Sequence, residues 1–341
     1  MYEAFYNFKE KPFNLTPDPD FLYFSPGHKK AMAYLQYGLD NGEGFVLVTG
    51  EIGSGKTTLV RNLLRSLHPS ARPANVVNPR GTFRQLMRII MAEFGVIPIT
   101  EEASRERLLS AFEQFARERA KNGMPVVIII DEAQNVDPAT LEELRMLSNL
   151  ETEKRKLVQI VLVGQPELRR ILESPELEQF NQRIAVRYHL EPLSLEETEH
   201  YVRHRLEVAG GKGTPVKFIR DGCRMVYAYS RGIPRKINIA CNAVLLAGFV
   251  DNKTSFNGKY VREAILDLDS AASLDVGLAE LERSDAAQPA TAQAAPPARR
   301  KRAEKPLLIG AAVGTAGVIV LVVFGWSSII SVIKSAVHLV F

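Results

Sequence analysis

The sequence predicts an α/β fold with a parallel-sheet core and a small all-α lid, followed by a flexible linker and one C-terminal transmembrane helix. Three observations lead to this prediction. Segments with strand composition alternate with helical patterns up to residue 191, which is typical of a parallel sheet covered by helices. Only helical patterns occur from Ser194 to residue 268, and no charged residue occurs between Leu307 and Ile333.

Composition narrows the class of protein. The chain has 341 residues, enough for two packed parts, and its net charge of +4 is too small to indicate nucleic-acid binding. Its 2 cysteines fit neither a disulfide framework nor a zinc site, so a reducing compartment is expected. The first residues lack the basic and apolar regions of a cleaved signal peptide.

Residues 1–44 are predicted to form an extended segment and a helix that pack on the core. Pro12, Pro17 and Pro19 exclude a long helix, and the aromatic residues around them favour an extended segment. Ser25-Pro26-Gly27 then has the composition of a helix start.

Residues 45–191 are predicted to form the core, which begins with a glycine-rich phosphate loop. The segment 50–57 reads G-x-x-x-x-G-K-[ST] and lies between a strand at 45–49 and a leucine-rich helix. Backbone N–H groups in such a loop turn inward around phosphate oxygens, and the helix directs its positive end toward them. Lys56 is placed to reach the β- and γ-phosphates, and Thr57 to hold Mg²⁺. The predicted nucleotide-binding residues are Gly50, Glu51, Ile52, Gly53, Ser54, Gly55, Lys56, Thr57 and Thr58.

The second feature of the core is a buried strand that ends in two acidic residues. Five consecutive β-branched residues at 126–130 indicate a strand covered on both faces. Asp131 and Glu132 follow it, at the edge where parallel sheets bind ligands. Asp131 is placed to hold Mg²⁺ through water, and Glu132 to polarise an attacking water. The alternative is an acidic loop that only caps the strand.

The remaining core elements follow from the same patterns. They are strands at 74–78, 157–163 and 184–190, and helices at about 82–94, at about 102–121 and after Asp137-Pro138. The strand at 157–163 leads into Gly164-Gln165-Pro166. Gln165 is therefore either a polar sensor of the γ-phosphate or a simple turn residue.

Residues 192–268 are predicted to form the lid. Two helices are expected at about 194–208 and 216–229, and a third starts at Gly232-Ile233-Pro234-Arg235. The inward face of the third helix is predicted to carry Ile237, Cys241, Leu245 and Leu246.

The C-terminal part differs in composition. Residues 269–305 are rich in Ala, Ser, Gln and Pro and end in a basic cluster, Arg299–Arg302 with Lys305, so a flexible linker is expected. The apolar segment 306–333 would form a helix of about 40 Å, long enough for a hydrocarbon core of about 30 Å. The preceding positive charges predict a single pass with the N-terminal part in the cytoplasm and a short tail, 334–341, beyond the membrane.

Taken together, these features resemble the AAA+ superfamily of ATPases. The similarity consists of the phosphate loop, the Asp-Glu strand end, Gln165 after the next strand, an arginine before the last strand, and Gly-x-Pro-Arg in a helical lid. The resemblance implies that Arg183 is an arginine finger presented to a neighbouring subunit, with Arg187 as the second candidate. It also implies that Arg235 is the sensor arginine of the lid. Surface salt bridges are the alternative role for Arg183 and Arg235.

A closer resemblance is to ATPases of the general secretion pathway protein A (ExeA) type. It extends over residues 1–268. The motifs that carry it are Lys11-Pro12-Phe13, Pro17-Asp18-Pro19, Ser25–His28, Asp131-Glu132-Ala133-Gln134, Gly164-Gln165-Pro166-Glu167-Leu168 and Gln182-Arg183-Ile184. Within this group the chain looks most like the branch found with exosortase (PEP-CTERM) and exopolysaccharide loci. The resemblance implies a bacterial inner-membrane protein with envelope or polysaccharide-export partners. Only eight residues follow Ile333, so no peptidoglycan-binding domain is expected there.

The first functional hypothesis is a membrane-anchored ATPase that binds and hydrolyses ATP with Mg²⁺ to drive or regulate envelope assembly, secretion or exopolysaccharide export. Glu132 would orient the attacking water, and Arg183 in trans would require a homo-oligomer. One alternative is a DNA-binding regulator of transposition, which the membrane segment and the lack of a basic domain disfavour. Another is a nucleotide-dependent scaffold with slow turnover.

Overall fold

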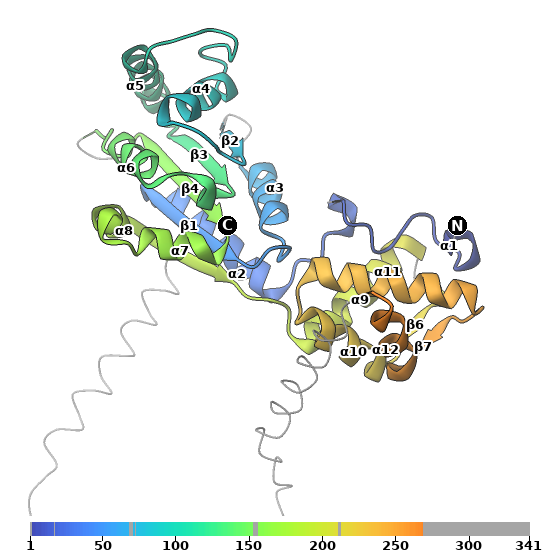
Figure 1. The fold of residues 1–341 in the computed structure, drawn as a ribbon. Coiled ribbons are helices and arrows are strands. Elements are labelled where there is room, and N and C mark those ends of the chain that lie inside the picture. Colours follow the sequence, from blue (N-terminus) through green and yellow to red (C-terminus); the bar gives the residue numbers. More distant parts are fainter. Residues whose placement is uncertain are drawn as a thin grey trace, which may run out of the picture. The chain divides into compact units, whose positions relative to one another are not determined.

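The computed structural model describes residues 2–268 except 17, 68–70, 72, 153–155 and 211–212 (Figure 1). These residues belong to one compact unit that spans Met1–Pro289. The predicted linker, transmembrane helix and tail lie outside the described residues. Among the helices of the described part, none combines the length and the apolar character needed to cross a bilayer.

A five-stranded parallel sheet forms the centre of the core, in the order β2-β3-β4-β1-β5. Its strands are β1 (Phe45–Gly50), β2 (Ala74–Val77), β3 (Val126–Asp131), β4 (Val158–Gly164) and β5 (Ile184–Leu190). Thr49 pairs with Gly164, Gly50 with Leu190, and Val77 with Asp131. The carboxyl ends of all five strands therefore meet at one edge of the sheet.

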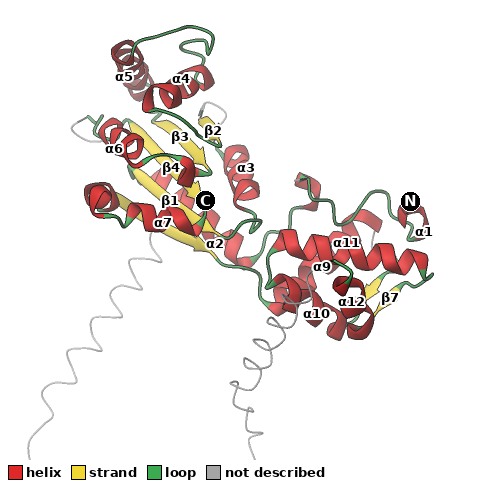
Figure 2. Ribbon diagram, viewed as in Figure 1, coloured by secondary structure: helices red, strands yellow, loops and turns green. Residues whose placement is uncertain are grey.

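Helices cover both faces of the sheet (Figure 2). One face packs against α2 (Pro26–Asp40) and α3 (Lys56–Ser66). The other packs against α4 (Phe83–Glu93), α5 (Arg105–Lys121), α6 (Pro138–Leu147), α7 (Pro166–Leu172) and α8 (Glu178–Asn181). Ile128 and Ile130 of β3 contact one of these layers, whereas Val127 and Ile129 contact the other. This double coverage explains why the strand is uninterrupted by polar residues.

The lid contains α9 (Leu195–Gly210), α10 (Arg220–Ser230), α11 (Pro234–Val250) and α12 (Gly258–Leu266). Between these helices Lys217–Phe218 (β6) pairs with Ser255–Phe256 (β7). The prediction of an all-α lid was therefore wrong in this detail. The helix expected from residue 216 begins at Arg220 because the two residues at 217–218 bond to β7.

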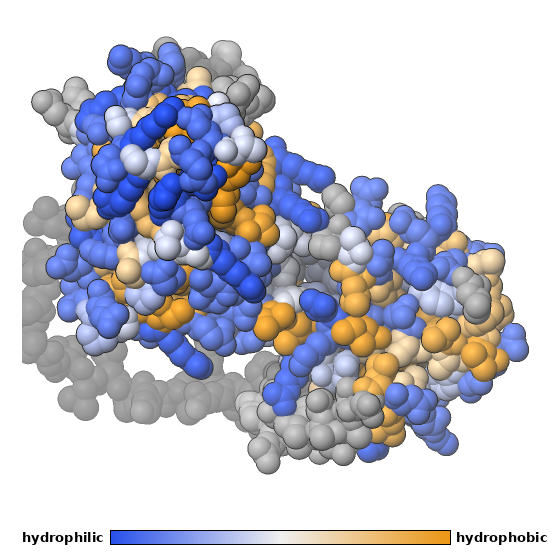
Figure 3. All heavy atoms as spheres, turned by 45° about the horizontal axis from the view of Figure 1, so that its top comes forward, coloured by the Kyte–Doolittle hydropathy of each residue, from blue (hydrophilic) through white to orange (hydrophobic). Residues whose placement is uncertain are grey.

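One predicted core position of the lid was also wrong. Leu246 is 49 % exposed, whereas Ile237, Cys241 and Leu245 are buried. These three residues are spaced by four positions along α11 and share one face of the helix, and Leu246 lies one step around the axis. In Figure 3, hydrophilic side chains cover most of the visible part of the core, and hydrophobic ones are more frequent over the lid.

The N-terminal segment packs against the lid, not against the core as the sequence analysis predicted. It contains the short helix α1 (Tyr2–Phe5) and a single 3₁₀ turn, Pro19–Phe21. Its aromatic residues join the hydrophobic cluster of α9–α12; they are Tyr2, Tyr6, Phe8, Phe13 and Phe21. Phe24 and α2, which follow this part of the segment, pack on the cluster that covers the sheet. The segment thus links the lid to the core.

A buried arginine holds the N-terminal segment on α9. Arg205 is only 6 % exposed, and its Nε and Nη2 atoms donate to the carbonyl oxygens of Pro12 (2.6 Å) and Asn14 (3.1 Å). Its guanidinium carbon lies 4.6 Å from the centroid of the Phe21 ring. Arginine suits this position because several N–H groups donate to carbonyl oxygens while the guanidinium plane contacts an aromatic face.

Candidate functional site

The phosphate loop connects β1 to α3 at the carboxyl edge of the sheet. It needs glycine at two places, because Gly53 has φ +80° and Gly55 has φ +104°. Gly50 is restricted by close approach, since an added Cβ would lie 2.9 Å from the carbonyl oxygen of Leu190. The loop therefore has the backbone conformation that lets successive N–H groups face a common point.

Lys56 lies within this loop. It is 5 % exposed, and its Nζ donates to the carbonyl oxygens of Gly50 (2.8 Å) and Glu51 (3.0 Å). Burial lowers the pKa of its ammonium group, and the charges of Glu132 and Asp131 counteract this effect. The ammonium is thus held at the loop, at the position from which the predicted contact with phosphate oxygens would be made.

Thr57 and Asp131 form a pair of oxygen donors beside the loop. The Thr57 hydroxyl donates to Oδ2 of Asp131 at 3.0 Å, and Asp131 is 1 % exposed. Burial raises the pKa of the Asp131 carboxyl, while hydrogen bonds from Thr57 and the Glu132 backbone oppose the rise. A hydroxyl and a carboxylate fit Mg²⁺, which prefers oxygen ligands. Within the described residues no group of three or more His, Cys, Asp or Glu could hold a metal ion.

Glu132 is held by two side-chain amides. Its Oε2 atom accepts hydrogen bonds from Nε2 of Gln134 (2.6 Å) and Nε2 of Gln165 (3.0 Å), and its backbone has φ +56°. Burial raises the pKa of the Glu132 carboxyl, but these two hydrogen bonds and the charge of Lys56 outweigh it, so the pKa is lowered. Glu132 is therefore ionised at neutral pH.

Gln134 is a site residue that the sequence analysis missed. Its Oε1 accepts the backbone N–H of Gln165 at 3.1 Å, so one amide links the end of β4 to the Glu132 carboxylate. The motif Asp131-Glu132-Ala133-Gln134 contained this residue, but its sequence position did not show that it turns back toward Glu132.

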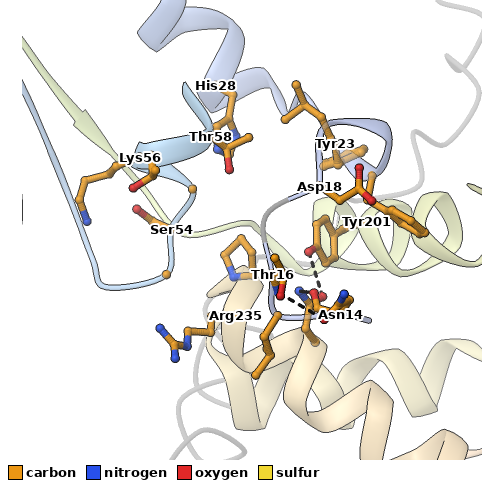
Figure 4. A pocket seen from close by; sticks show the side chains of 18 of the residues that line it. Asn14, Thr16, Asp18, Tyr23, His28, Ser54, Lys56, Thr58, Tyr201 and Arg235 are labelled. Carbon is orange, nitrogen blue, oxygen red and sulfur yellow. Dashed lines mark hydrogen bonds between the residues drawn. The ribbon is translucent and has the colours of Figure 1, made fainter. Parts of the chain in front are cut away.

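The lid meets the loop at the first turn of α11. The backbone N–H of Arg235 donates to the carbonyl oxygen of Gly53 at 3.3 Å, and a Cβ on Gly53 would lie 2.6 Å from Cβ of Arg235. Arg235 also lines a pocket of ≈ 270 Å³ between the loop, the lid and the N-terminal segment. Figure 4 labels the lining residues Asn14, Thr16, Asp18, Tyr23, His28, Ser54, Lys56, Thr58, Tyr201 and Arg235.

Two of the predicted arginines lie away from this pocket. Arg183 precedes β5, where Ile184 pairs with Phe45, the first residue of β1. It therefore sits at the amino edge of the sheet, opposite the phosphate loop, and donates to Oδ1 of Asn149. Arg187 donates to the carbonyl oxygen of Asn181. Both side chains are exposed, and neither lines the pocket at the phosphate loop.

Comparison with known proteins shows what this chain is similar to. Residues 39–172 match the family described as AAA domain. Over 249 residues the chain is 43% identical to general secretion pathway protein A of Aeromonas hydrophila. The match covers 73% of this chain and 45% of that relative, so the chain spans less than half the length of the relative.

Two solved structures share the fold. Cdc6p from Pyrobaculum aerophilum has a TM-score of 0.57 and 17% identity, covering 73% of this chain and 70% of that one. ORC2 of Aeropyrum pernix has a TM-score of 0.56 and 17% identity, covering 76% of this chain and 72% of that one. At this identity the likeness concerns the fold alone, and it confirms the predicted α/β P-loop NTPase fold with a parallel sheet.

We expect Gly55→Ala to weaken ATP binding by at least about 10-fold, because the loop would have to leave a backbone conformation that alanine strains. An added Cβ would also lie 2.6 Å from Nε2 of His28. The control is Gly123→Ala, since Gly123 has φ +71° but nothing within 4 Å of an added Cβ. Calorimetric titration with ATP separates the two: equal losses in both variants would contradict a specific requirement at the loop.

Proposed function

We propose that this chain, whose residues 39–172 match the AAA domain family, binds and hydrolyses Mg-ATP. The observation that supports this most directly is the convergence of Lys56, Asp131 and Glu132 at one edge of the sheet. Their distances to Gly50, Thr57 and Gln165 are those of hydrogen bonds, from 2.8 to 3.0 Å. These groups supply the charge, the metal ligands and the water-orienting carboxylate of phosphoryl transfer.

In the proposed chemistry, the loop first binds the phosphates of the nucleotide. Backbone N–H groups of residues 50–58 and the Lys56 ammonium would contact the phosphate oxygens, and Lys56 would exchange its contacts with two loop carbonyls for these contacts. Thr57 and Asp131 would hold Mg²⁺, which neutralises charge on the phosphates when bound. Oε2 of Glu132 already accepts two amides, which leaves Oε1 to accept a hydrogen bond from the attacking water. Gln165, which donates to the same carboxylate, would sense the γ-phosphate.

The pocket between the N-terminal segment and the lid is the proposed site of the base. Its walls include Asn14 and Tyr23 from the segment and Tyr201 and Asn238 from the lid, and Tyr201 donates to Oδ1 of Asn238 at 2.9 Å. Arg235 lies at the junction with the loop. We propose that it couples the state of the nucleotide to the position of the lid.

The exposed position of Arg183 supports a homo-oligomer as a further part of the proposal. A finger at the amino edge of the sheet cannot serve its own phosphate loop at the opposite edge, but it can be presented to a neighbouring subunit. Arg187 remains the second candidate for this role.

The cellular role proposed for this ATPase is in secretion or envelope assembly, including exopolysaccharide export. It rests on the 43% identity to general secretion pathway protein A and on the motifs that resemble that type of ATPase. The same proposal includes a place in the exosortase branch and partners in polysaccharide export. It also includes a cytoplasmic ATPase domain that residues 306–333 anchor to the inner membrane.

A nucleotide-dependent switch with slow turnover is the second candidate. It is favoured by the two amides that hold the Glu132 carboxylate and lower its pKa, because a less basic carboxylate polarises water less strongly. In that case ATP binding and slow release, not rapid hydrolysis, would be the signal.

Glu132→Gln tests the assignment of the water-orienting group. We expect ATP affinity within about 3-fold of the parent and ATP turnover reduced by about 10²–10⁴-fold, because the amide cannot accept the water proton. The matched control is Glu113→Gln, which removes an exposed carboxylate that pairs with Arg117 on α5. Steady-state phosphate release measures the ATP turnover of both variants. Unchanged turnover in Glu132→Gln would overturn the assignment, and slow turnover in the parent itself would favour the switch.

Mixing two inactive variants tests the finger in trans. Glu132→Gln retains Arg183, and Arg183→Ala retains an intact phosphate site, so neither is expected to hydrolyse ATP alone. In an equimolar mixture about a quarter of the sites would combine an intact site with an intact neighbouring arginine, and ATPase activity should reappear. The same mixture made with Arg187→Ala discriminates between the two candidates. Full activity of both arginine variants alone would contradict a finger at either position.

A further inference from the structure

His28 lies beside the phosphate loop and is among the residues that line the pocket there. It is 5 % exposed and belongs to the first turn of α2, whose N-cap is Ser25. Its Nδ1 lies 2.8 Å from Oγ of Ser25, and the same oxygen accepts the backbone N–H of His28 at 3.2 Å. The Ser25 oxygen can accept the backbone N–H and still donate its own proton, which allows the tautomer with Nδ1 as acceptor and the ring proton on Nε2.

The Nε2 side of the ring faces the loop. A Cβ built on Gly55 would lie 2.6 Å from Nε2, so the ring approaches a backbone position where only glycine fits. A hydrogen bond with the backbone of Ser54 is among the causes that raise the pKa of the ring. The N–H of Ser54 donates to the carbonyl oxygen of Glu51 at 3.1 Å, so the carbonyl of Ser54 is the partner of Nε2–H.

This contact has a geometric consequence for the loop. In a planar trans peptide the C=O and N–H bonds point in opposite directions. A hydrogen bond that directs the Ser54 carbonyl toward His28 therefore directs the N–H of Gly55 away from His28.

We propose that His28 is a positioning residue, which orients the peptide between Ser54 and Gly55 so that the Gly55 N–H faces the bound phosphate. The proposal rests on the proposed function, because it assumes that the loop binds nucleotide phosphates. Neither Ser25 nor His28 would touch the nucleotide phosphates in this role. Ser25 fixes the tautomer, and His28 fixes the peptide.

The surroundings of the ring suit this role. Burial lowers the pKa of His28, opposed by the contact with Ser54 and the charge of Glu197, so the ring is neutral at pH 7 and carries one proton. The first turn of α2 is itself held in place, because the Tyr188 hydroxyl donates to the carbonyl oxygen of Gly27 at 3.0 Å. A ring on a fixed turn can hold a peptide in one orientation.

Three substitutions of His28 test this inference. They differ in whether the new side chain has a hydrogen-bond donor and in how far that donor reaches. His28→Gln places an amide near the level of Nε2 and retains the donor. His28→Phe fills the space without a donor, and His28→Asn has an amide that reaches only the level of Nδ1. ADP and adenosine binding to the full-length protein would be measured by calorimetry and by displacement of a fluorescent nucleotide, with melting temperatures as a check of folding.

We expect His28→Phe and His28→Asn to bind ADP about 10- to 100-fold more weakly, the loss of one charge-assisted hydrogen bond, and His28→Gln to stay within about 3-fold of the parent. Adenosine affinity should fall less than ADP affinity in His28→Phe and His28→Asn, because the phosphate contact is altered in addition to the pocket lining. His200→Phe, at an exposed histidine of α9, is the matched control and should bind ADP as the parent does.

Three outcomes would overturn the inference. ADP affinity could be unchanged in both His28→Phe and His28→Asn, the Gln variant could fail as the Asn variant does, or adenosine affinity could fall in parallel with ADP affinity. If His28→Phe does not fold, the ADP affinities of His28→Asn and His28→Gln still test the inference. If the parent binds neither ATP nor ADP, the proposed function fails together with this inference, whereas a parent that binds both leaves only the role of His28 in question.

Discussion

Parallel pairing of β1, β3 and β4 is the constraint on which the rest of the structure depends. It brings Gly50, Asp131 and Gly164, which are far apart in the sequence, to one edge of the sheet. Each strand end is followed by a group with separate chemistry: an ammonium in a glycine loop, two carboxylates, and an amide. The Thr57–Asp131 and Gln165–Glu132 hydrogen bonds join residues that are 74 and 33 positions apart in the sequence. Strand pairing is what brings these residues together.

The second level of organisation joins this edge to the lid. The N-terminal segment contributes aromatic residues to the lid cluster and then continues into α2, whose first turn holds His28 beside the phosphate loop. Arg205 fixes the segment to α9 through the carbonyls of Pro12 and Asn14, and Arg235 contacts the loop from the lid side. Any change at the phosphates thus has two physical connections to the lid, one through Gly53 and one through α2.

Local patterns made much of the core predictable from the sequence. Spacing over a few residues predicts the glycine loop, the buried strand before Asp131 and most helices. These patterns are local and can be recognised without knowing the tertiary structure. What could not be predicted depends on partners distant in sequence. Arg205 meets carbonyls 191 and 193 residues away, and the two-residue strands β6 and β7 have too little pattern of their own. The inward turn of Gln134 and the contact of His28 with Ser54 likewise depend on side-chain direction, which spacing does not encode.

The central claim is that main-chain N–H groups and one ammonium bind the phosphates of ATP at the end of β1. Its most direct test is the affinity of the full-length protein and of Lys56→Ala for Mg-ATP, measured by calorimetry, with the exposed Lys29→Ala as control. The account predicts that Lys56→Ala binds at least about 100-fold more weakly, because a buried charge-assisted contact is lost, while Lys29→Ala matches the parent. Equal affinity of Lys56→Ala and the parent would contradict it.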